Sequence, residues 1–392
     1  MGLTGDLQKL VCELVAIESV NPDLVATGGG ESKIAAFVAA WLAAEGLAVQ
    51  VVEPVPGRAS VIGVLAGAGG GPSLMLNAHM DTVGAGGMKD AFVPVVREGR
   101  VYGRGAYDMK GSLAAIMVTA REAKKLKPHG DVIIAAVADE EVASIGTAAV
   151  LKRVEADAAI VTEPTEMRLC LAHKGFAWLE VETRGVAAHG SRPDLGVDAI
   201  AHMGRIVTGV LELDRRLRAG RGHLLLGTGT IHASLVEGGQ ELSTYPARCV
   251  VTLERRTIPG EDGTSALREV EALIVAARAE DPALEASARL LLERPPSQLG
   301  ADSFVTEAVE KAATEVLRRE PEVIGVAYWM DMALSNAMGI PTVAFGPSGE
   351  GAHADVEWVD LASLEQCVQV YLRTAELICN GGGQAASRLR RF

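Results

Sequence analysis

Short apolar runs alternate with helical segments through the first 161 residues, and this order limits the folds that the chain can adopt. Val132–Val137 holds six apolar residues in a row, which is typical of a strand buried on both faces of a sheet. Parallel strands need long crossover connections, which helices usually provide. The alternation therefore predicts an α/β fold with a mostly parallel sheet flanked by helices. The expected strands span residues 48–52, 59–65, 73–78, 132–138 and 157–161, and the expected helices span 5–17, 31–45, 109–127 and 145–153.

The pattern changes after residue 175. The segment FAWLEVETRG at 176–185 alternates apolar and polar residues, as does a strand with one exposed face. Further strands are expected at 228–236, 247–255 and 285–292, with helices at 197–217 and 262–279. This β-α-β-β-α-β order predicts an inserted α+β, ferredoxin-like module. The α/β pattern then returns, with helices expected at 302–318, 331–338 and 361–379 and a strand at 341–345. We therefore expect a main domain of residues 1–174 plus 295–392, interrupted by an inserted domain of residues 175–294.

Composition and charge argue against several classes of protein. The chain has 392 residues, 48% of them apolar, and its net charge of −13 makes nucleic acid an unexpected partner. No apolar stretch reaches the about 18 residues that a membrane-spanning helix needs, so no membrane partner is expected either. The five cysteines show no CxxC spacing, and the first residues lack the features of a signal peptide. These features predict reduced thiols and a cytoplasmic location.

Polar side chains that can bind metal ions follow the predicted strands of the main domain. They are His79 and Asp81 after 73–78, Asp108 at the start of helix 109–127, Glu140 and Glu141 after 132–138, Glu163 after 157–161, and His353 in a glycine-rich loop after 341–345. The carboxyl ends of parallel strands meet at one edge of a sheet, so these side chains are expected to lie close together. Two histidines and three of these carboxylates, with no thiolate, suit a pair of divalent cations. A bound metal pair also explains why three acids, residues 139–141, follow a buried strand.

Each of these residues has an ordinary alternative when it is considered alone. Asp108 suits the N-cap of a helix, Glu163 before Pro164 suits a turn, and residues 139–141 suit a solvated loop. The glycine run at 67–71 suggests a dinucleotide site, but a strand follows it where a phosphate-binding loop must open a helix. We therefore interpret that run as a hairpin loop, and an oxidoreductase is the less favoured alternative.

Six motifs, in order along the chain, are similar to those of a known family of enzymes. They read LNAHMDTV (76–83), GRGAYDMKG (103–111), ADEEVASIGT (138–147), VTEPT (161–165), AAHGSRPDLGVDAI (187–200) and GEGAHADVEW (349–358). This set resembles the dinuclear zinc amidohydrolases and peptidases, the family of acetylornithine deacetylase, succinyl-diaminopimelate desuccinylase, aminoacylase and carboxypeptidase G. The resemblance covers nearly the whole chain. It implies a zinc-peptidase-like catalytic domain, and it implies that the inserted domain is a lid through which two chains form a homodimer.

The resemblance also implies a ligand set for two divalent metal ions per chain. His79 and Glu163 would hold one ion, Glu141 and His353 the other, and Asp108 would bridge both. The implied metal is Zn²⁺, with Co²⁺ or Mn²⁺ as alternatives. Two cations lower the pKa of a shared water from about 15.7 towards neutrality, which makes a metal-bridged hydroxide available to attack an amide.

Three further residues receive catalytic roles from the resemblance. Glu140 matches the general base, which takes a proton from water and returns it to the leaving amine. Asp81 matches the acid that orients the imidazole of His79, a support that metal-bound histidines usually have. His189 matches a catalytic histidine of the lid that approaches the substrate during hydrolysis. The peptide between Asp108 and Met109 is expected to be cis.

The inserted domain offers a substrate-binding arginine and also departs from the family. Arg256 matches a lid arginine that contacts a substrate carboxylate, and it is preferred to Arg255, which is expected to be exposed on the opposite face of the strand. Where many relatives have an Asn before a Pro, this chain reads STYP at 243–246. The segment AYWMDMAL at 327–334 replaces a smaller stretch rich in Gly, Ser and Thr. These departures leave the acyl group and the amine of the substrate open.

The expected function is hydrolysis of the amide bond of an N-acyl amino acid, as in acetylornithine deacetylase. A metallo-carboxypeptidase or dipeptidase acting on a short peptide has the same ligand set and is the alternative, as is a deacylase like succinyl-diaminopimelate desuccinylase. A non-catalytic relative would lack Glu140 or a metal ligand, and none of these residues is missing.

Overall fold

The computed structural model describes residues 2–381 of the chain. Within these residues the chain forms two compact units. Unit 1 consists of residues 2–171, 299–324 and 330–381, and unit 2 consists of residues 172–298 and 325–329. The sequence-based boundaries at 174/175 and 294/295 differ from this division by three or four residues, and residues 325–329 group with unit 2 rather than with the main domain.

Unit 1 is built on a sheet whose central strands are parallel, which confirms the expected α/β fold. Its strand order includes β1-β2-β6-β3-β7-β15-β8. β3 pairs in parallel with both β6 and β7, and β7 pairs in parallel with β15. The strands are β1 (Ala48–Val52), β2 (Ser60–Leu65), β3 (Leu74–His79), β6 (Val132–Val137), β7 (Ala158–Val161), β8 (Leu169–His173) and β15 (Thr342–Ala344), and β13 (Ser297–Gln298) and β14 (Val323–Val326) pair with β8. Every residue of β3 and β6 is buried, as the apolar runs predict.

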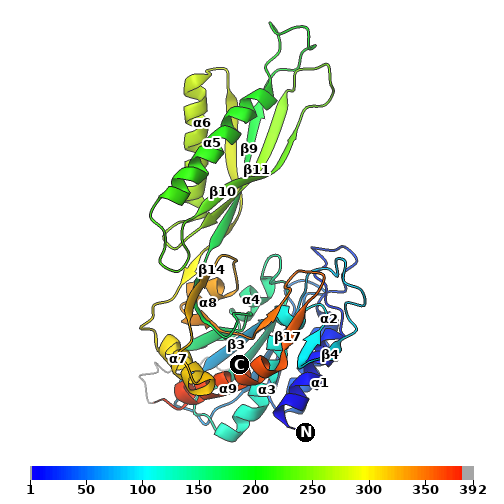
Figure 1. Cartoon of the computed structure of the whole chain (residues 1–392), viewed down its shortest axis with the longest axis vertical. Coiled ribbons are helices and arrows are strands. Elements are labelled where there is room, and N and C mark those ends of the chain that lie inside the picture. Colours follow the sequence, from blue (N-terminus) through cyan, green and yellow to red (C-terminus); the bar gives the residue numbers. More distant parts are fainter. Residues whose placement is uncertain (1, 382–392) are drawn as a thin grey trace. The chain divides into compact units, whose positions relative to one another are not determined.

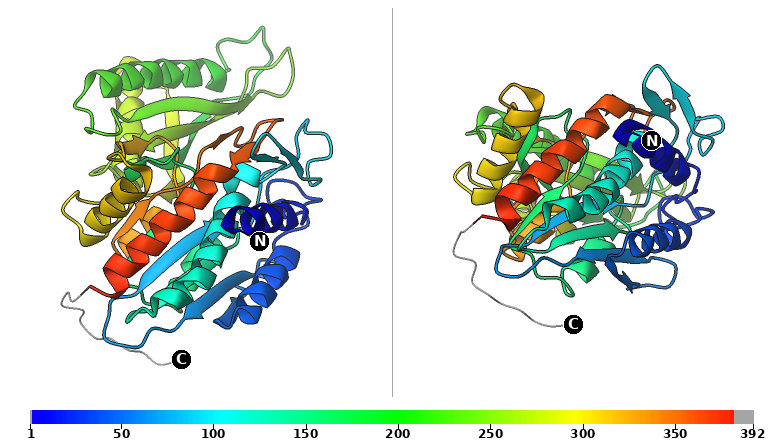
Figure 2. Two further views of the ribbon diagram at one scale, coloured as in Figure 1. Left: turned by 60° about the horizontal axis from the view of Figure 1, so that its bottom comes forward. Right: turned by 90° about the horizontal axis from the view of Figure 1, so that it is seen from below.

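Helices cover both faces of this sheet. One face carries α2 (Ser32–Ala44), α3 (Gly111–Ala123) and α9 (Leu361–Cys379), with α1 (Leu3–Val15) packed on α3 and α9, and α7 (Phe304–Leu317) packed on α9 (Figure 2). The opposite face carries α4 (Ile145–Val150) and α8 (Met332–Ala337). Two adjacent residues of β2 face opposite helical layers. Gly63 approaches Leu42 of α2, and Ile62 packs with Val150 of α4. The sheet is therefore buried between two helical layers.

A second, smaller sheet joins two segments that are far apart in the sequence. Its antiparallel order is β16-β17-β5-β4, formed by β4 (Val95–Arg97), β5 (Arg100–Tyr102), β16 (Gly349–Glu350) and β17 (Trp358–Asp360). In it, Val101 of β5 lies opposite Val359 of β17. This pairing brings the loop after β5 to the loop between β16 and β17.

Unit 2 has the β-α-β-β-α-β order that the sequence predicts. The elements are β9 (Gly175–Arg184), α5 (Ala199–Ala219), β10 (Thr230–Gly238), β11 (Arg248–Thr257), α6 (Gly263–Glu280) and β12 (Glu285–Arg294). The antiparallel strand order is β10-β11-β9-β12, and α5 and α6 lie side by side against one face of this sheet (Figure 1). Buried residues alternate along β9 and β11 because only that face meets the helices. This topology is ferredoxin-like.

Two expectations from composition can be compared with the structure. No helix between residues 2 and 381 combines the length and the apolar character needed to cross a membrane. All five cysteines are free thiols, and four of them are buried.

Candidate metal centre

Three strands of the parallel core end beside one another and present polar residues at one edge of the sheet. β3 ends at His79, Glu140 and Glu141 follow β6, and Glu163 follows β7. Because β3 lies between β6 and β7 and runs parallel to both, the three carboxyl ends are neighbours. This is the edge at which open α/β sheets bind ligands.

Asp108 and His353 reach the same edge from the two loops that the small sheet joins. Asp108 lies in the turn Ala106–Lys110, where the backbone of Asp108 and Met109 is not helical, and its peptide bond with Met109 is cis, as the resemblance implied. The following helix α3 begins at Gly111 and has no side-chain cap. Asp108 is therefore not a helix N-cap, and its carboxylate is available for another partner.

The carboxylate of Asp108 lies between two imidazole rings. Its Oδ1 is 3.0 Å from Nε2 of His79, and its Oδ2 is 3.4 Å from Nε2 of His353. Nε2 of His79 also lies 3.7 Å from Oε1 of Glu163, and Nε2 of His353 lies 3.1 Å from Oε2 of Glu141. The five side chains form one cluster, in which each oxygen of Asp108 faces one histidine.

The acids of this cluster are buried beside one another. Burial is the largest cause that raises the pKa of Glu163 to about 8; the charge of His79 opposes this shift, and those of Asp108 and Glu141 add to it. Burial is also the main cause that raises the pKa values of Glu140 and Glu141. Hydrogen bonds to Asp108 and Glu141 raise the pKa of His353 to about 10. Burial opposes ionisation of Asp108 too, but its hydrogen bonds to His353 and His79 lower its pKa. Buried carboxylates held beside histidines whose pKa values are raised mark a place where positive charge is favoured.

The donor atoms of the cluster fit divalent cations. Ligand atoms of His79, Asp108 and Glu141 all lie within 4.8 Å of one another, and so do those of His79, Glu140 and Glu163. Oε1 of Glu141 is buried and has no hydrogen-bond partner among the residues that the structure describes. An unpaired buried oxygen is costly, and a cation at the cluster would satisfy it. Imidazole and carboxylate donors without a thiolate suit Zn²⁺, Co²⁺ or Mn²⁺.

Asp81 holds the strand end and the acidic turn together. The backbone carbonyl of Asp81, at 2.9 Å, is the partner of Nδ1 of His79, whereas its carboxylate oxygen is 3.6 Å away. That carboxylate instead accepts hydrogen bonds from the backbone N–H groups of Glu140 and Glu141, at 3.1 and 3.2 Å. Asp81 thus orients His79 through its backbone and positions the two glutamates through its side chain.

A buried polar network that the sequence analysis missed supports this turn. Asn21 donates to the carboxylates of Asp81 and Asp139, at 2.8 and 3.0 Å. Arg58 contacts Asp139 at 2.6 Å and forms two hydrogen bonds with the buried Glu31, at 2.8 and 2.9 Å. Asp139 itself has a positive φ of 67°, which a non-glycine residue rarely adopts. The network fixes the turn from which Glu140 and Glu141 project.

Asp331 is a further acid near the cluster that the sequence analysis did not single out. It is buried directly before α8 and accepts a hydrogen bond from Thr147. Burial raises the pKa of Asp331 to about 6. The charge of Asp331 contributes to the raised pKa values of Glu140 and Glu163. An acid between apolar residues, as in YWMDMAL, was the available signal in the sequence.

Two predicted site residues, His189 and Arg256, belong to unit 2. His189 lies in an exposed loop, where its Nδ1 is 2.8 Å from Oγ of Ser191. Arg256 donates to Glu254 at 2.7 Å, and its guanidinium lies 5.2 Å from the ring centre of Phe176. The five-residue cluster of unit 1 does not include either side chain.

The expectation that Arg255 is exposed was wrong. Arg255 is 1% exposed and forms ion pairs with Glu261 at 2.9 Å and with Glu269 at 2.8 Å. Strand periodicity places Arg255 and Arg256 on opposite faces, but it does not say which face is covered. Two glutamates on the helical side of the sheet allow Arg255 to be buried, which leaves Arg256 as the more accessible arginine.

The chain is similar to known proteins in its sequence and in its fold. The model of Peptidase family M20/M25/M40 matches residues 75–377. Acetylornithine deacetylase from Myxococcus xanthus is 30% identical over 83% of this chain and 85% of that protein. N-formyl-4-amino-5-aminomethyl-2-methylpyrimidine deformylase from Bacillus subtilis is 26% identical over 94% of this chain and 93% of that protein. The crystal structure of aminopeptidase PepT from Bacillus cereus has the same fold, with a TM-score of 0.79 at 20% identity over 96% of this chain and 98% of that one.

The fold of unit 1 and the imidazole and carboxylate groups at its sheet edge are features of a metal-dependent amidohydrolase. The chain belongs to Peptidase family M20/M25/M40, which confirms the family expected from the six sequence motifs.

Proposed function

We propose that the chain hydrolyses the amide bond of an N-acyl amino acid with two metal ions bound in unit 1. One observation carries this proposal: Asp108 lies within 3.4 Å of both histidines, and each histidine also faces a glutamate. His79 and Glu163 would hold one ion, Glu141 and His353 the other, and Asp108 both. The absence of thiolate donors favours Zn²⁺, with Co²⁺ and Mn²⁺ as alternatives.

The residues of unit 1 suggest how hydrolysis would proceed. When bound, the two cations supply Lewis-acid chemistry, which polarises a carbonyl and lowers the pKa of a water. Glu140 is placed with His79 and Glu163 in one group of ligand atoms, while the neighbouring Glu141 faces His353. We assign Glu140 as the general base, which takes a proton from the attacking water and gives it to the departing amine.

Two residues of unit 2 complete the proposal. The side chain of Arg256 is partly accessible. We assign it to binding a carboxylate of the substrate, because a guanidinium can form two parallel hydrogen bonds with a carboxylate. His189 is assigned to catalysis from the motif at 187–200; its ring is exposed, and its Nδ1 lies 2.8 Å from Oγ of Ser191. Both assignments rest on the motifs around these residues.

The substrate can be tested on the purified protein. After chelation, Zn²⁺, Co²⁺ or Mn²⁺ is added back, and kcat/KM is measured for N-acetyl, N-formyl and N-succinyl amino acids and for dipeptides. We expect metal-dependent hydrolysis, with N-acetyl amino acids such as N-acetylornithine preferred. Preference for dipeptides would favour the metallo-carboxypeptidase or dipeptidase alternative, and preference for N-succinyl substrates the desuccinylase-like one. No hydrolysis of any compound would refute the proposed function.

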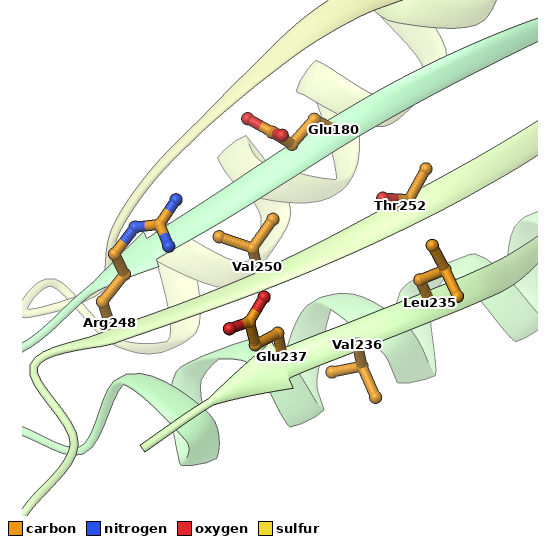
Figure 3. Close-up of a pocket in the computed structure, with 7 residues that line it drawn as sticks. All are labelled: Glu180, Leu235, Val236, Glu237, Arg248, Val250 and Thr252. Atoms are coloured by element: carbon orange, nitrogen blue, oxygen red, sulfur yellow. The ribbon is translucent and has the colours of Figure 1, made fainter. Parts of the chain in front are cut away.

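We further propose that two chains form a homodimer through unit 2. Strand β10 ends the sheet of this unit, and its Leu235 and Val236 are each 70% exposed. Both side chains help to line a hollow of about 450 Å³ on the sheet (Figure 3), together with Glu180, Glu237, Arg248, Val250 and Thr252. An exposed edge strand with apolar side chains favours pairing with another strand.

Sedimentation equilibrium is expected to give twice the 40.9 kDa chain mass. The substitution Leu235→Lys should weaken the association, because it places a charge on the edge strand. A monomer at all concentrations would contradict the proposed homodimer.

A further inference from the structure

Glu357 is a buried acid whose contacts go to the loop that carries Asp108. It is 1% exposed and lies at the end of the loop that contains His353. Its Oε1 accepts hydrogen bonds from the backbone N–H groups of Tyr107 and Asp108, at 2.9 and 3.0 Å. Its Oε2 accepts one from the N–H of Gly105 at 2.9 Å. A single carboxylate therefore holds three backbone amides of the turn from which Asp108 projects.

Arg104 completes this contact and extends it to His353. Its Nη1 is 2.7 Å from Oε2 of Glu357, and Arg104 is also 1% exposed. Its Nη2 donates to the carbonyl of Ala354, the residue after His353, at 2.8 Å. The Arg104–Glu357 pair thus touches both loops whose side chains meet at the cluster.

The loop has little freedom to adopt another path. Gly105 has a φ of +79°, and a Cβ atom there would lie 2.7 Å from Thr82. His353 has a φ of +63°, which is uncommon for a residue other than glycine. Backbone in such conformations persists only where surrounding contacts hold it. Glu357 and Arg104 supply those contacts on both sides of the cluster.

Stability alone does not account for this arrangement. Burying an ion pair removes two charges from water, and replacing such a pair with apolar residues is often neutral or stabilising. Every named donor to Glu357 belongs to residues 104–108, and the pair reaches residue 354 as well. The contacts are concentrated where ligand geometry is set.

We propose that Glu357, paired with Arg104, is a positioning residue that places the Asp108 carboxylate and the His353 imidazole for metal binding. This inference rests on the proposed two-metal function. Partners that orient metal ligands typically contribute about 10–100-fold to metal affinity or activity. Glu357 acts through the backbone of the Asp108 turn, and Arg104 acts through the backbone beside His353.

Glu357→Gln tests the proposal. The amide has nearly the shape of the carboxylate, but its NH₂ group replaces one accepting oxygen and cannot accept hydrogen bonds from the N–H donors that face it. We expect the apparent affinity for Zn²⁺, measured by competition with a chromogenic chelator, to fall by about 10–100-fold. Glu350→Gln is the matched control. Glu350 is exposed at the end of β16, directly before the loop that contains His353 and Glu357, and this variant should keep the wild-type affinity.

A double variant separates positioning from the cost of leaving Arg104 unpaired. Arg104→Met combined with Glu357→Gln removes both charges, so a loss that comes only from an unpaired buried charge should disappear. In chelator, we expect the double variant to unfold at a temperature closer to that of the wild type than Glu357→Gln does. Its Zn²⁺ affinity should stay low. Recovery of both quantities would overturn the proposal, as would unchanged affinity in Glu357→Gln.

The same titration distinguishes this inference from the proposed function. If the wild-type chain does not bind Zn²⁺, the two-metal proposal fails before any variant is compared. If the wild-type chain binds about two ions and Glu357→Gln binds them equally tightly, only the positioning role of Glu357 is refuted.

Discussion

Glu140→Gln is expected to reduce kcat by a factor of about 10²–10⁴, the usual contribution of a general base, while about two metal ions remain bound per chain. The amide cannot take a proton from the attacking water, but the five ligand side chains are unchanged. Steady-state kinetics with the best substrate, together with metal analysis of the same preparation, measures both quantities. Glu320→Gln, at an exposed position of unit 1, is the control and should keep wild-type kcat.

The neighbouring Glu141 makes this test specific. Oε2 of Glu141 lies 3.1 Å from Nε2 of His353, whereas Glu140 is grouped with His79 and Glu163. The same substitution at Glu141 should therefore remove metal, and at Glu140 it should remove turnover only. A Glu140→Gln variant with wild-type kcat would eliminate Glu140 as the base. Loss of metal from that variant would instead make Glu140 a ligand.

The sheet of unit 1 was predictable from the sequence because its strands are mostly apolar. The observed β1, β2, β3, β6 and β7 begin and end within one residue of the expected strands. The small sheet was not anticipated. Its strands have only two or three residues, and β5 is stabilised by pairing with β17, which lies 258 residues later at the pair Val101 and Val359. No local pattern reports such a contact.

The site was predictable in part for the same reason. His79 and Glu163 follow apolar runs directly, so the strand ends locate them. The start of the third helix was expected at residue 109, but α3 begins at Gly111, because the backbone of Asp108 and Met109 is not helical. Apolar periodicity does not reveal such a break, so it did not show how Asp108 is presented.

Supporting residues were missed because their partners are distant in the sequence. Arg104 and Glu357 are separated by 253 positions, and Arg58 and Asp139 by 81. Each residue taken alone is a charged side chain in a loop, for which exposure is the ordinary expectation. Only the fold brings the opposite charges together and makes their burial possible.

Asp108→Ala is expected to weaken binding of both metal ions by about 10²-fold or more, beyond the loss typical of a residue that only orients a ligand. The reason is that Asp108 has one oxygen facing each histidine, at 3.0 and 3.4 Å. Metal stoichiometry and affinity should be measured by equilibrium dialysis. Asp302→Ala, which removes an exposed carboxylate from unit 1, is the control and should bind about two ions as the wild type does.

His353→Ala provides the contrast that identifies Asp108 as the bridge. The side chain of His353 is 55% exposed and faces Asp108 and Glu141, so its removal should weaken one ion and leave the His79 and Glu163 side intact. A bridging Asp108 therefore predicts loss of two ions in one variant and of one ion in the other. If both variants lose a single ion, Asp108 serves one site only. If Asp108→Ala binds two ions at wild-type affinity, the carboxylate of Asp108 is not a ligand.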